Sequence, residues 1–387
     1  MPGTSTALDR EWSVLLAACS AIPLQDKLLL LEPLLQQPIR WNVLFELADR
    51  HGTQPLLCQA LTGLGPAVPA KEMLALKQAY QTNLHKSLLL SRELIRIVDC
   101  VTVLNLDVMP YKGPALAEVL YGDIALRKSG DIDLLIRAQD LAGVRDAVRD
   151  LGYIPHMSLS AAQERAYVKS GYEYAFDGAA GPNLLELQWA IQPRFYAVDF
   201  DMDGVFQRAV TITVVGRPMR TPALDDLFLV LSLHAAKHVW GRLVWLCDIA
   251  RLMSCSDMNW ERVGAQAREL GIVRILRVTM LLTNRLLGAA IPAAAERSLP
   301  PEREAAALAE EVQMYVLSET TFNVESLSYF RLMMRLRELG ADRRRFLRRL
   351  VLTPGLGEWN AIPLPPVLFP LYRLVRIARL AARVVRR

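Results

Sequence analysis

The chain has 387 residues, of which 52% are hydrophobic and 22% are charged, so its composition is that of a folded protein and excludes a disordered one. The net charge of +5 is compatible with anionic substrates, but aromatic and basic residues are not interleaved, which argues against nucleic acid as a partner. No apolar run approaches the ~18 residues of a membrane helix, the N-terminus lacks a secretory pattern, and the five cysteines form no CxxC pair. We therefore expect a cytoplasmic protein with reduced cysteines.

The first part of the chain, residues 1–104, has the pattern of a helical region. Apolar residues recur there at the spacing of one helix face, as in Trp12, Leu15, Leu16 and Cys19. A break rich in Gly and Pro spans residues 63–69. A long helix is expected to follow, from Lys71 to about Leu104, and to lead into a first strand.

The next part, residues 105–220, alternates strand and helix patterns. A strand is expected over Val108–Tyr111 and a helix over Pro114–Leu120, with Lys112-Gly113 between them. Proline is favourable at the first position of a helix, and the free N–H groups of a helix N-terminus attract an anion. This junction therefore predicts a phosphate-binding turn.

Two aspartates, Asp131 and Asp133, interrupt the apolar run of residues 131–136, which follows a turn signal at Ser129-Gly130. Because side chains alternate along a strand, Asp131 and Asp133 project from one face while the apolar residues between them point into a core. Neighbouring carboxylates repel each other unless a cation lies between them, and hard oxygen ligands suit Mg²⁺. The alternative is that Asp131 only ends a turn and Asp133 lies on a solvated strand face.

Further elements complete this part. Helices are expected over Gln139–Leu151 and Ala161–Lys169, and a strand hairpin is expected from Tyr172–Phe176 and Asn183–Ala190. Glu186 and Gln188 share one face of the second hairpin strand, so Glu186 is the candidate for a third carboxylate. Glu173, on the neighbouring strand, is the alternative. A second hairpin is expected over Thr211–Val215 and Pro218–Arg220, turned at Gly216-Arg217.

The run KGPAL…R…SGDIDLLI resembles the signature of the uncharacterised nucleotidyltransferase family of bacteria, within the DNA polymerase β-like nucleotidyltransferase superfamily. Asp131 and Asp133 match the DxD motif of the superfamily, and the resemblance supports Glu186 as the acidic residue of a later strand. The chain departs from the pattern at Pro114, where the wider superfamily has Ser after Gly, and at Gln188, where His is common. The resemblance implies an α+β fold with a mixed-sheet catalytic core flanked by N- and C-terminal helical regions.

Residues 221–350 are expected to form a C-terminal helical lobe. Thr221-Pro222 carries the signals of a helix start, and His234 and His238 follow on one face of that helix. The segment from His234 to Asp248 also resembles the family. His234, Lys237 and Arg242 are candidates for phosphate or acceptor contacts, and Asp248 is a candidate for orienting one of these bases. The alternative is helix packing with local salt bridges.

The last part, residues 351–387, reads as a Pro-containing connector up to Pro370 and a basic amphipathic tail helix. Five arginines recur on one face of the tail: Arg373, Arg376, Arg379, Arg383 and Arg387. A helix of this kind can lie on an anionic membrane surface or contact a protein partner, while the alternative is a terminal helix packed against the body.

The resemblance implies a Mg²⁺-dependent transferase, for which Mn²⁺ is an alternative metal, that moves NMP from an NTP to an acceptor hydroxyl. Asp131, Asp133 and Glu186 are the expected catalytic and metal-binding residues. The expected nucleotide-binding residues are Lys112, Gly113, Arg127, Ser129, Gly130, His234 and Lys237. The acceptor, a small molecule, a peptide or a protein, cannot be read from the sequence. The alternative is a catalytically weak nucleotide-binding or regulatory protein of the same fold.

Overall fold

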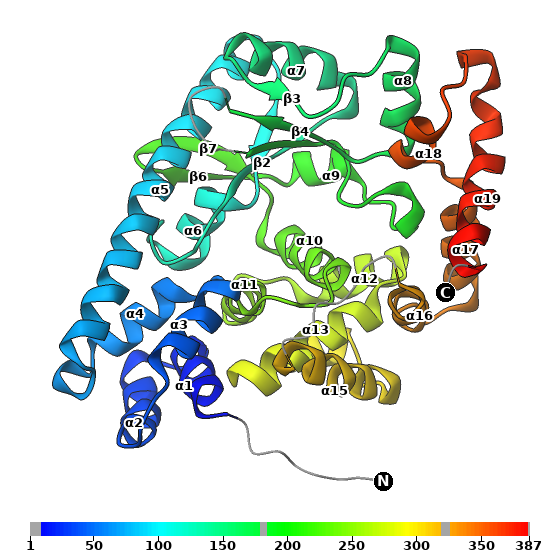
Figure 1. The fold of residues 1–387 in the computed structure, drawn as a ribbon. Coiled ribbons are helices and arrows are strands. Elements are labelled where there is room, and N and C mark those ends of the chain that lie inside the picture. The colour runs from blue at the N-terminus through cyan, green and yellow to red at the C-terminus, as the bar shows by residue number, and fades with distance from the viewer. Residues whose placement is uncertain (1–8, 179–183, 319–325, 386–387) are drawn as a thin grey trace.

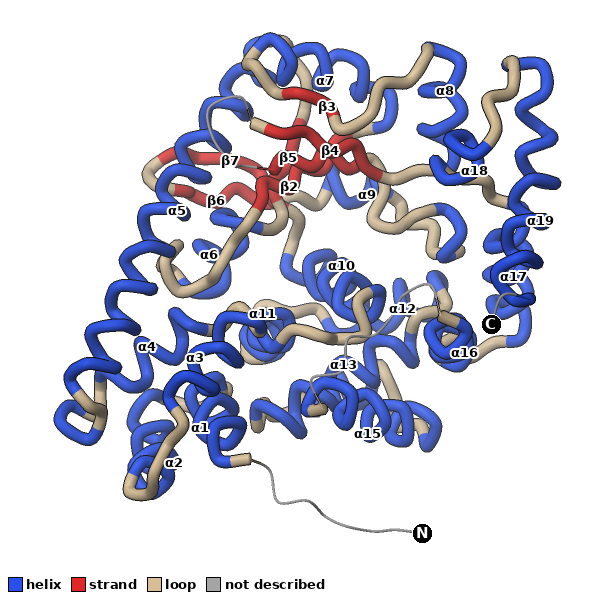
Figure 2. The backbone as a smooth tube through the Cα atoms, viewed as in Figure 1, coloured by secondary structure: helices blue, strands red, loops and turns tan. Residues whose placement is uncertain are grey.

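The computed structural model describes residues 9–178, 184–318 and 326–385. A β-sheet lies between the long helix α5 and the helix α10, and further helices pack beyond α10 (Figures 1 and 2). The helices that precede the sheet are α1 (Arg10–Cys19), α2 (Leu24–Leu35), α3 (Trp41–Arg50), α4 (Gln54–Thr62) and α5 (Ala70–Val103). The long helix predicted from Lys71 is therefore confirmed.

In the described part of the chain, five short strands form the main sheet, in the order β1-β2-β5-β4-β3. Strands β2 and β5 run parallel, and the other neighbours are antiparallel. A separate two-stranded sheet pairs β6 with β7. The elements of this part are β1 (Val108–Pro110), α6 (Gly113–Tyr121), β2 (Asp131–Ile136), α7 (Leu141–Asp150), β3 (Ile154–Pro155), α8 (Ala161–Ser170), β4 (Glu173–Asp177), β5 (Leu184–Gln188), α9 (Met202–Gln207), β6 (Val210–Val214) and β7 (Arg217–Thr221).

The main sheet has one apolar face and one polar face. The apolar residues of β2, Ile132 and Leu134, are buried with Leu185 of β5 against residues of α5 and α7. The opposite face carries the carboxylates and looks toward α10 (Figure 1). The α+β class with a mixed sheet flanked by helical regions is thereby confirmed.

The helices after the sheet share one hydrophobic core with the N-terminal helices. They are α10 (Leu224–Lys237), α11 (Leu243–Met253), α12 (Trp260–Leu270), α13 (Val273–Leu287), α14 (Ala293–Ser298), α15 (Arg303–Leu317), α16 (Leu327–Arg335) and α17 (Gly340–Leu352). Helix α1 packs against α13, and the N–H of Ala21 donates to the carbonyl of Leu287 at 2.9 Å. The first and third predicted parts of the chain thus lie side by side, although their boundaries remain predictions.

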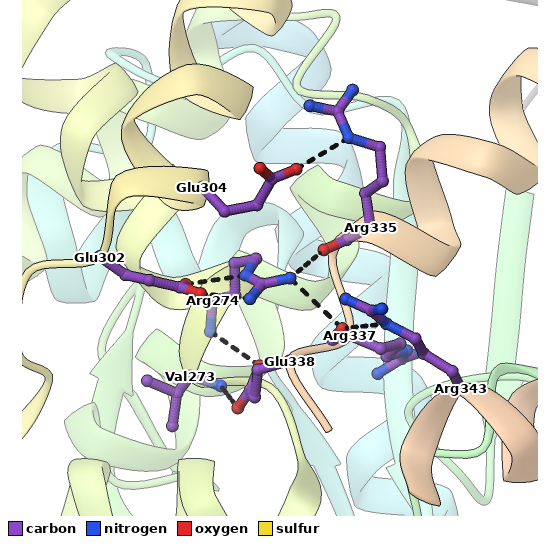
Figure 3. A network of polar contacts seen from close by, with 8 residues as sticks. All are labelled: Val273, Arg274, Glu302, Glu304, Arg335, Arg337, Glu338 and Arg343. Carbon is purple, nitrogen blue, oxygen red and sulfur yellow. Dashed lines mark hydrogen bonds and ion pairs between the residues drawn. The ribbon is translucent and has the colours of Figure 1, made fainter. Parts of the chain in front are cut away.

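A buried arginine ties three of these helices together (Figure 3). Arg274, at the start of α13, donates from Nε to Glu302 at 2.7 Å, just before α15, and from Nη1 to the carbonyl of Arg337 at 3.3 Å, beyond α16. Its own backbone N–H donates to Glu338 at 3.2 Å. Since hydrogen bonds to charged groups are the stronger ones, this network holds the far side of the lobe in place.

The predicted helix start at Thr221-Pro222 is wrong. Thr221 is the last residue of β7, where it pairs with Val210, and its hydroxyl donates to the carbonyl of Pro110 at 2.8 Å. Helix α10 begins at Leu224 instead and has no side-chain cap. The strand pairing of Thr221 and its buried hydrogen bond together outweigh the local preference of a threonine for a helix cap.

The β6–β7 hairpin turns one residue earlier than predicted, at Val215-Gly216, and Arg217 already belongs to β7. Both turn residues have positive φ, 48° and 79°. A two-residue turn of this kind matches the right-handed twist of the two strands, which explains the shift.

The predicted connector after residue 350 is more ordered than expected. It contains α18 (Leu356–Ala361) and a 3₁₀ segment over Pro366–Leu371, and Trp359 is buried against Tyr167 of α8. The tail helix α19 (Tyr372–Val385) packs against α17. Packing against the body, the alternative interpretation, thus describes the tail, although the side chains of Arg383 and Arg387 lie outside the described part.

The charged side chains of the tail contribute to this packing. Arg376 donates from Nε to the carbonyl of Leu350 at 2.6 Å, and both Arg376 and Arg379 pair with Glu358 of α18. In the described part of the chain, no helix combines the length and the apolar character needed to cross a bilayer.

Candidate active site

The three predicted carboxylates lie on one face of the sheet. Asp133 of β2 stands directly opposite Glu186 of the parallel strand β5, and Asp131 lies two residues before Asp133. Side chains at paired positions of neighbouring parallel strands share a face, so the three acidic groups lie on the same face of the sheet. Asp131 and Glu186 are half-buried, while only 1% of the Asp133 side chain is exposed.

The electrostatics of this face favour a bound cation. Burial, together with the negative charge of Asp133, raises the pKa of Asp131 and raises the pKa of Glu186 to about 8. The Oδ2 atom of Asp133 is buried and has no hydrogen-bond partner among the described residues. An orphaned carboxylate oxygen beside two further carboxylates is costly unless a positive charge lies nearby.

Lys112 supplies part of that positive charge. Its Nζ lies 3.0 Å from Oδ1 of Asp133, and the side chain is 11% exposed. Burial alone would lower the pKa of Lys112, but the neighbouring Asp133 and Tyr111 raise it above its ordinary value, so the amine stays protonated.

The residue after Lys112 must be a glycine, because its backbone lies in the left-handed region and has no room for a Cβ atom. Gly113 has a φ of +60°, and a Cβ atom there would lie 3.0 Å from the backbone oxygen of Asp131. Gly113 therefore lets the start of α6 approach β2. It lies behind the site, and it is not among the residues that line the cleft.

Gln188 connects two of the carboxylates, a role that the sequence left open. Its Nε2 atom donates to Oε2 of Glu186 at 2.8 Å and to Oδ1 of Asp133 at 3.3 Å. Its Oε1 atom accepts a hydrogen bond from the hydroxyl of Tyr111. Both donors of the amide thus face the acidic groups, and the tyrosine fixes its orientation.

Helix α10 supplies the opposite wall. Lys237 Nζ donates to the hydroxyl of Tyr172 at 2.6 Å and lies 4.4 Å from the centre of that ring, while burial lowers the pKa of Lys237. Burial also lowers the pKa of His234 well below its ordinary value, so this imidazole is neutral at pH 7. The His234 ring stacks edge-on against Trp245 of α11, with centroids 5.1 Å apart.

A cleft of about 510 Å³ separates the sheet from α10 and α11. Of the predicted site residues, the structure brings eight to its walls: Lys112, Arg127, Ser129, Gly130, Asp131, Glu186, His234 and Lys237. Glu173, the alternative third carboxylate, and Arg242, the further candidate for phosphate or acceptor contacts, line it as well. Asp133 lies beneath the surface, under Lys112 and Gln188.

Sequence reasoning missed the aromatic part of the cleft, which Tyr111, Tyr172 and Trp245 line. The only signal for two of them was adjacency in sequence, since Tyr111 precedes Lys112 and Tyr172 precedes Glu173. Lys128 also lines the cleft, as a further cation beside Arg127.

The prediction for Asp248 needs correction. This residue of α11 does not orient a base of the helical lobe but pairs with Arg127, whose Nε and Nη2 lie 3.0 Å from its carboxylate oxygens. Asp248 also accepts from the hydroxyl of Tyr121 at 2.9 Å. Arg127 in turn donates from Nη1 to Ser129 at 3.2 Å. Helix α11 thus anchors the loop that leads into β2.

The residues present fit a hard divalent cation in their chemistry. Within residues 9–178, 184–318 and 326–385, no three or more His, Cys, Asp or Glu side chains are arranged so that they could hold a metal ion together. The donors of Lys112 and Gln188 instead occupy oxygens of Asp133 and Glu186. The free Oδ2 of Asp133 and the two half-buried carboxylates beside it are the oxygen ligands that Mg²⁺ prefers.

Comparisons with known proteins identify a family for this chain. The sequence model of a protein family described as "Uncharacterised nucleotidyltransferase" matches residues 37–288, a span that includes the sheet and both walls of the cleft. This confirms the resemblance predicted from the motifs. A search of curated proteins finds no match.

Two solved structures show a weak likeness. One is the solution structure of the antibiotic-resistance factor ANT(2'')-Ia, with 16% identity over 46% of this chain and 89% of that chain, and a TM-score of 0.34. The other is an antigenic nucleotidyltransferase-like protein from Paracoccidioides brasiliensis, with 16% identity over 55% of this chain and 96% of that chain, and a TM-score of 0.31.

Proposed function

This chain belongs to the uncharacterised nucleotidyltransferase family, and we propose that it transfers a nucleoside monophosphate from an NTP to a hydroxyl group of an acceptor, with Mg²⁺ as cofactor. The observation that carries the proposal is the register of β2 and β5, which sets Glu186 opposite Asp133 on the face that carries Asp131. Lys237 and Arg242 lie on the walls of the same cleft as this acidic face. A site of this kind is suited to a metal-bound polyphosphate.

The residues have the following roles in the proposed reaction. Asp131, Asp133 and Glu186 would hold Mg²⁺, or Mn²⁺ in its place, and the metal would neutralise charge on the phosphates and polarise the acceptor hydroxyl. Lys112 and Arg127 would neutralise charge on the departing pyrophosphate. Ser129 and Gly130 would form the turn beside the phosphates, and Gly113 permits the close approach of α6 to β2.

The opposite wall would bind the remainder of the nucleotide. Lys237 presents a further cation, and the neutral His234 presents an imidazole that can donate or accept a hydrogen bond. We place the reaction in the cytoplasm, in line with the scattered cysteines, and we retain contact of the basic tail with a membrane or a protein as an untested prediction.

A specific observation favours a second candidate function. Gln188 bonds to both Glu186 and Asp133, and Lys112 neutralises Asp133, so part of the acidic face is already satisfied without a metal. A protein that binds a nucleotide without turning it over would fit such a site. This candidate and the transferase differ in metal dependence and in the release of pyrophosphate.

The test uses each of the four NTPs labelled at the α-phosphate, with Mg²⁺ and a cell extract that supplies acceptors. Wild type is compared with Asp131→Ala/Asp133→Ala and with the control Asp150→Asn, which changes an exposed aspartate of α7. The transferase predicts label transfer and pyrophosphate release by wild type and by the control but not by the double variant. Equal transfer by all three proteins would reject the proposal. Nucleotide binding without any transfer would support the second candidate.

A further inference from the structure

A second cavity of about 350 Å³ adjoins the cleft on the side of the tail helix. Tyr172, Lys237 and His238 line both cavities, so the two share a wall. The far side of the second cavity is built from the segment Arg194–Tyr196, from α16 and α17, and from the tail elements α18 and α19. The polypeptide that follows the helical lobe thus closes a space directly beside the proposed nucleotide site.

The shared wall is held by hydrogen bonds. Lys237 Nζ donates to Tyr172, and the backbone carbonyl of Lys237 accepts from the hydroxyl of Tyr329 at 3.0 Å. Tyr172 directly precedes Glu173, which lines the cleft from β4. The second cavity therefore borders the cleft at the Tyr172–Lys237 pair, next to the acidic residue Glu173.

The second cavity is lined by aromatic rings. Four of them come from two segments that lie more than 130 residues apart in the sequence: Phe195, Tyr196, Tyr329 and Phe330. Leu350 and Leu380 add aliphatic surface. Rings of this kind give a large contact area to a flat apolar ligand, and the volume lies at the lower end of the range for small-molecule sites.

Positive charge exceeds negative charge in this cavity. Arg376 and Arg379 lie 3.2 and 3.3 Å from the carboxylate oxygens of Glu358, which is 8% exposed. Among the described residues that line the cavity, Glu358 is the only acidic one, whereas Lys237 adds a third cation. An anionic group of a ligand would therefore be attracted to this cavity.

We propose that this second cavity binds the acceptor, and that the acceptor is a small aromatic carboxylate that carries a hydroxyl group. The inference rests on the proposed function. The rings would hold the apolar body of the acceptor, the excess of cations would attract its carboxylate, and its hydroxyl would extend past Tyr172 and Lys237 toward the acidic face. A polycationic acceptor is disfavoured by the same charges.

The transfer step balances with an NTP as the second substrate. The acceptor oxygen forms a new bond to the α-phosphorus, and the bond from that phosphorus to its bridging oxygen breaks, so that pyrophosphate leaves. The proton of the acceptor hydroxyl is released to solvent water. No oxidant or further reactant is required.

Three probes of equal ring and chain length test the charge preference: 4-hydroxyphenylacetate, the neutral 2-(4-hydroxyphenyl)ethanol and the cationic tyramine. Saturation-transfer NMR on the full chain measures their binding without any need for turnover. We expect 4-hydroxyphenylacetate to bind about tenfold more tightly than tyramine, which corresponds to one favourable charge interaction. Equal binding of the three probes, or binding of none, would overturn the inference.

Two variants locate the binding. Arg379→Gln removes a cation of the cavity and should reduce the preference for the carboxylate about tenfold, and Phe330→Ala should weaken all three probes. Arg373→Gln is the matched control, because Arg373 is exposed on the same helix and does not line the cavity. An equal effect of the control and Arg379→Gln would contradict the assignment.

A second readout separates this inference from the proposed function. Release of pyrophosphate from an NTP is measured with Mg²⁺, with and without 4-hydroxyphenylacetate. If release depends on Asp131 and Asp133 but neither the probe nor the cavity variants alter it, the acceptor assignment fails and the transferase stands. If the probe binds in the cavity but no NTP is turned over under any condition, the transferase fails, and with it the role of the probe as an acceptor.

Discussion

Replacing Asp248 by asparagine should destabilise the protein strongly, although this residue lies outside the acidic face. Asp248 and Arg127 are 1% and 7% exposed, and three nitrogen–oxygen distances of 3.0 Å join them. Two unit charges 4 Å apart attract each other by about 4 kcal/mol at an effective dielectric constant of 20. Removing one partner of a buried pair costs about 3–5 kcal/mol, because the other charge remains buried. Asparagine keeps one oxygen, so we expect a loss of about 3 kcal/mol.

Urea unfolding at pH 7, followed by tryptophan fluorescence and by circular dichroism, measures this loss as a lower midpoint at an unchanged slope. The control is Asp49→Asn, which breaks the ion pair between Asp49 and Lys128. Because the side chains of Asp49 and Lys128 are 56% and 39% exposed, this change should cost under about 1 kcal/mol. The double variant Arg127→Met/Asp248→Leu should lose less than the sum of the single changes, since no charge is left unpaired. A loss for Asp248→Asn no larger than that of the control would refute the reasoning.

Two further substitutions test other parts of the structure. Gly113→Ala should lower the free energy of unfolding in urea by about 1–3 kcal/mol, because an alanine with a φ of +60° and a Cβ 3.0 Å from the backbone oxygen of Asp131 is strained. An unchanged free energy of unfolding would contradict the close approach of α6 to β2. The hydrogen bond from Arg40 lowers the pKa of Glu11 from 4.5 to about 2. The ionised carboxylate therefore stabilises the fold at pH values above 4.5, and this contribution is lost as the pH falls toward 2. Glu11→Gln should therefore lower the midpoint of unfolding at pH 7, with a difference from wild type that shrinks below pH 4; a difference that is constant from pH 7 to pH 3 would exclude this linkage.

The acidic strand was readable from the sequence because its information is local. Alternation of Asp131 and Asp133 with apolar residues fixes which side chains share a face, and the same argument places Glu186 and Gln188 together. What the pattern could not supply is the position of β5 between β2 and β4, which brings Glu186 opposite Asp133. Strand order depends on how the whole chain packs, and no short spacing encodes it.

The contacts that the sequence missed are long-range. Arg127 and Asp248 lie 121 residues apart, and Thr221 bonds to a carbonyl 111 residues earlier. Each residue had a plausible local role, as a phosphate ligand or as a helix cap, and a buried partner from a distant segment changed or refined that role. The cavity beneath the tail was missed for the same reason, since Phe195 and Phe330 line one cavity only in the folded chain.

The central claim is that Asp131, Asp133 and Glu186 together hold a divalent cation against the phosphates of a nucleotide. Electron paramagnetic resonance of Mn²⁺, titrated into the protein with a non-hydrolysable NTP analogue, tests it most directly. The account predicts that wild type binds Mn²⁺ with the nucleotide, and that Asp133→Asn and Glu186→Gln each weaken this binding by about tenfold or more. Mn²⁺ affinity in both variants equal to that of wild type would contradict it.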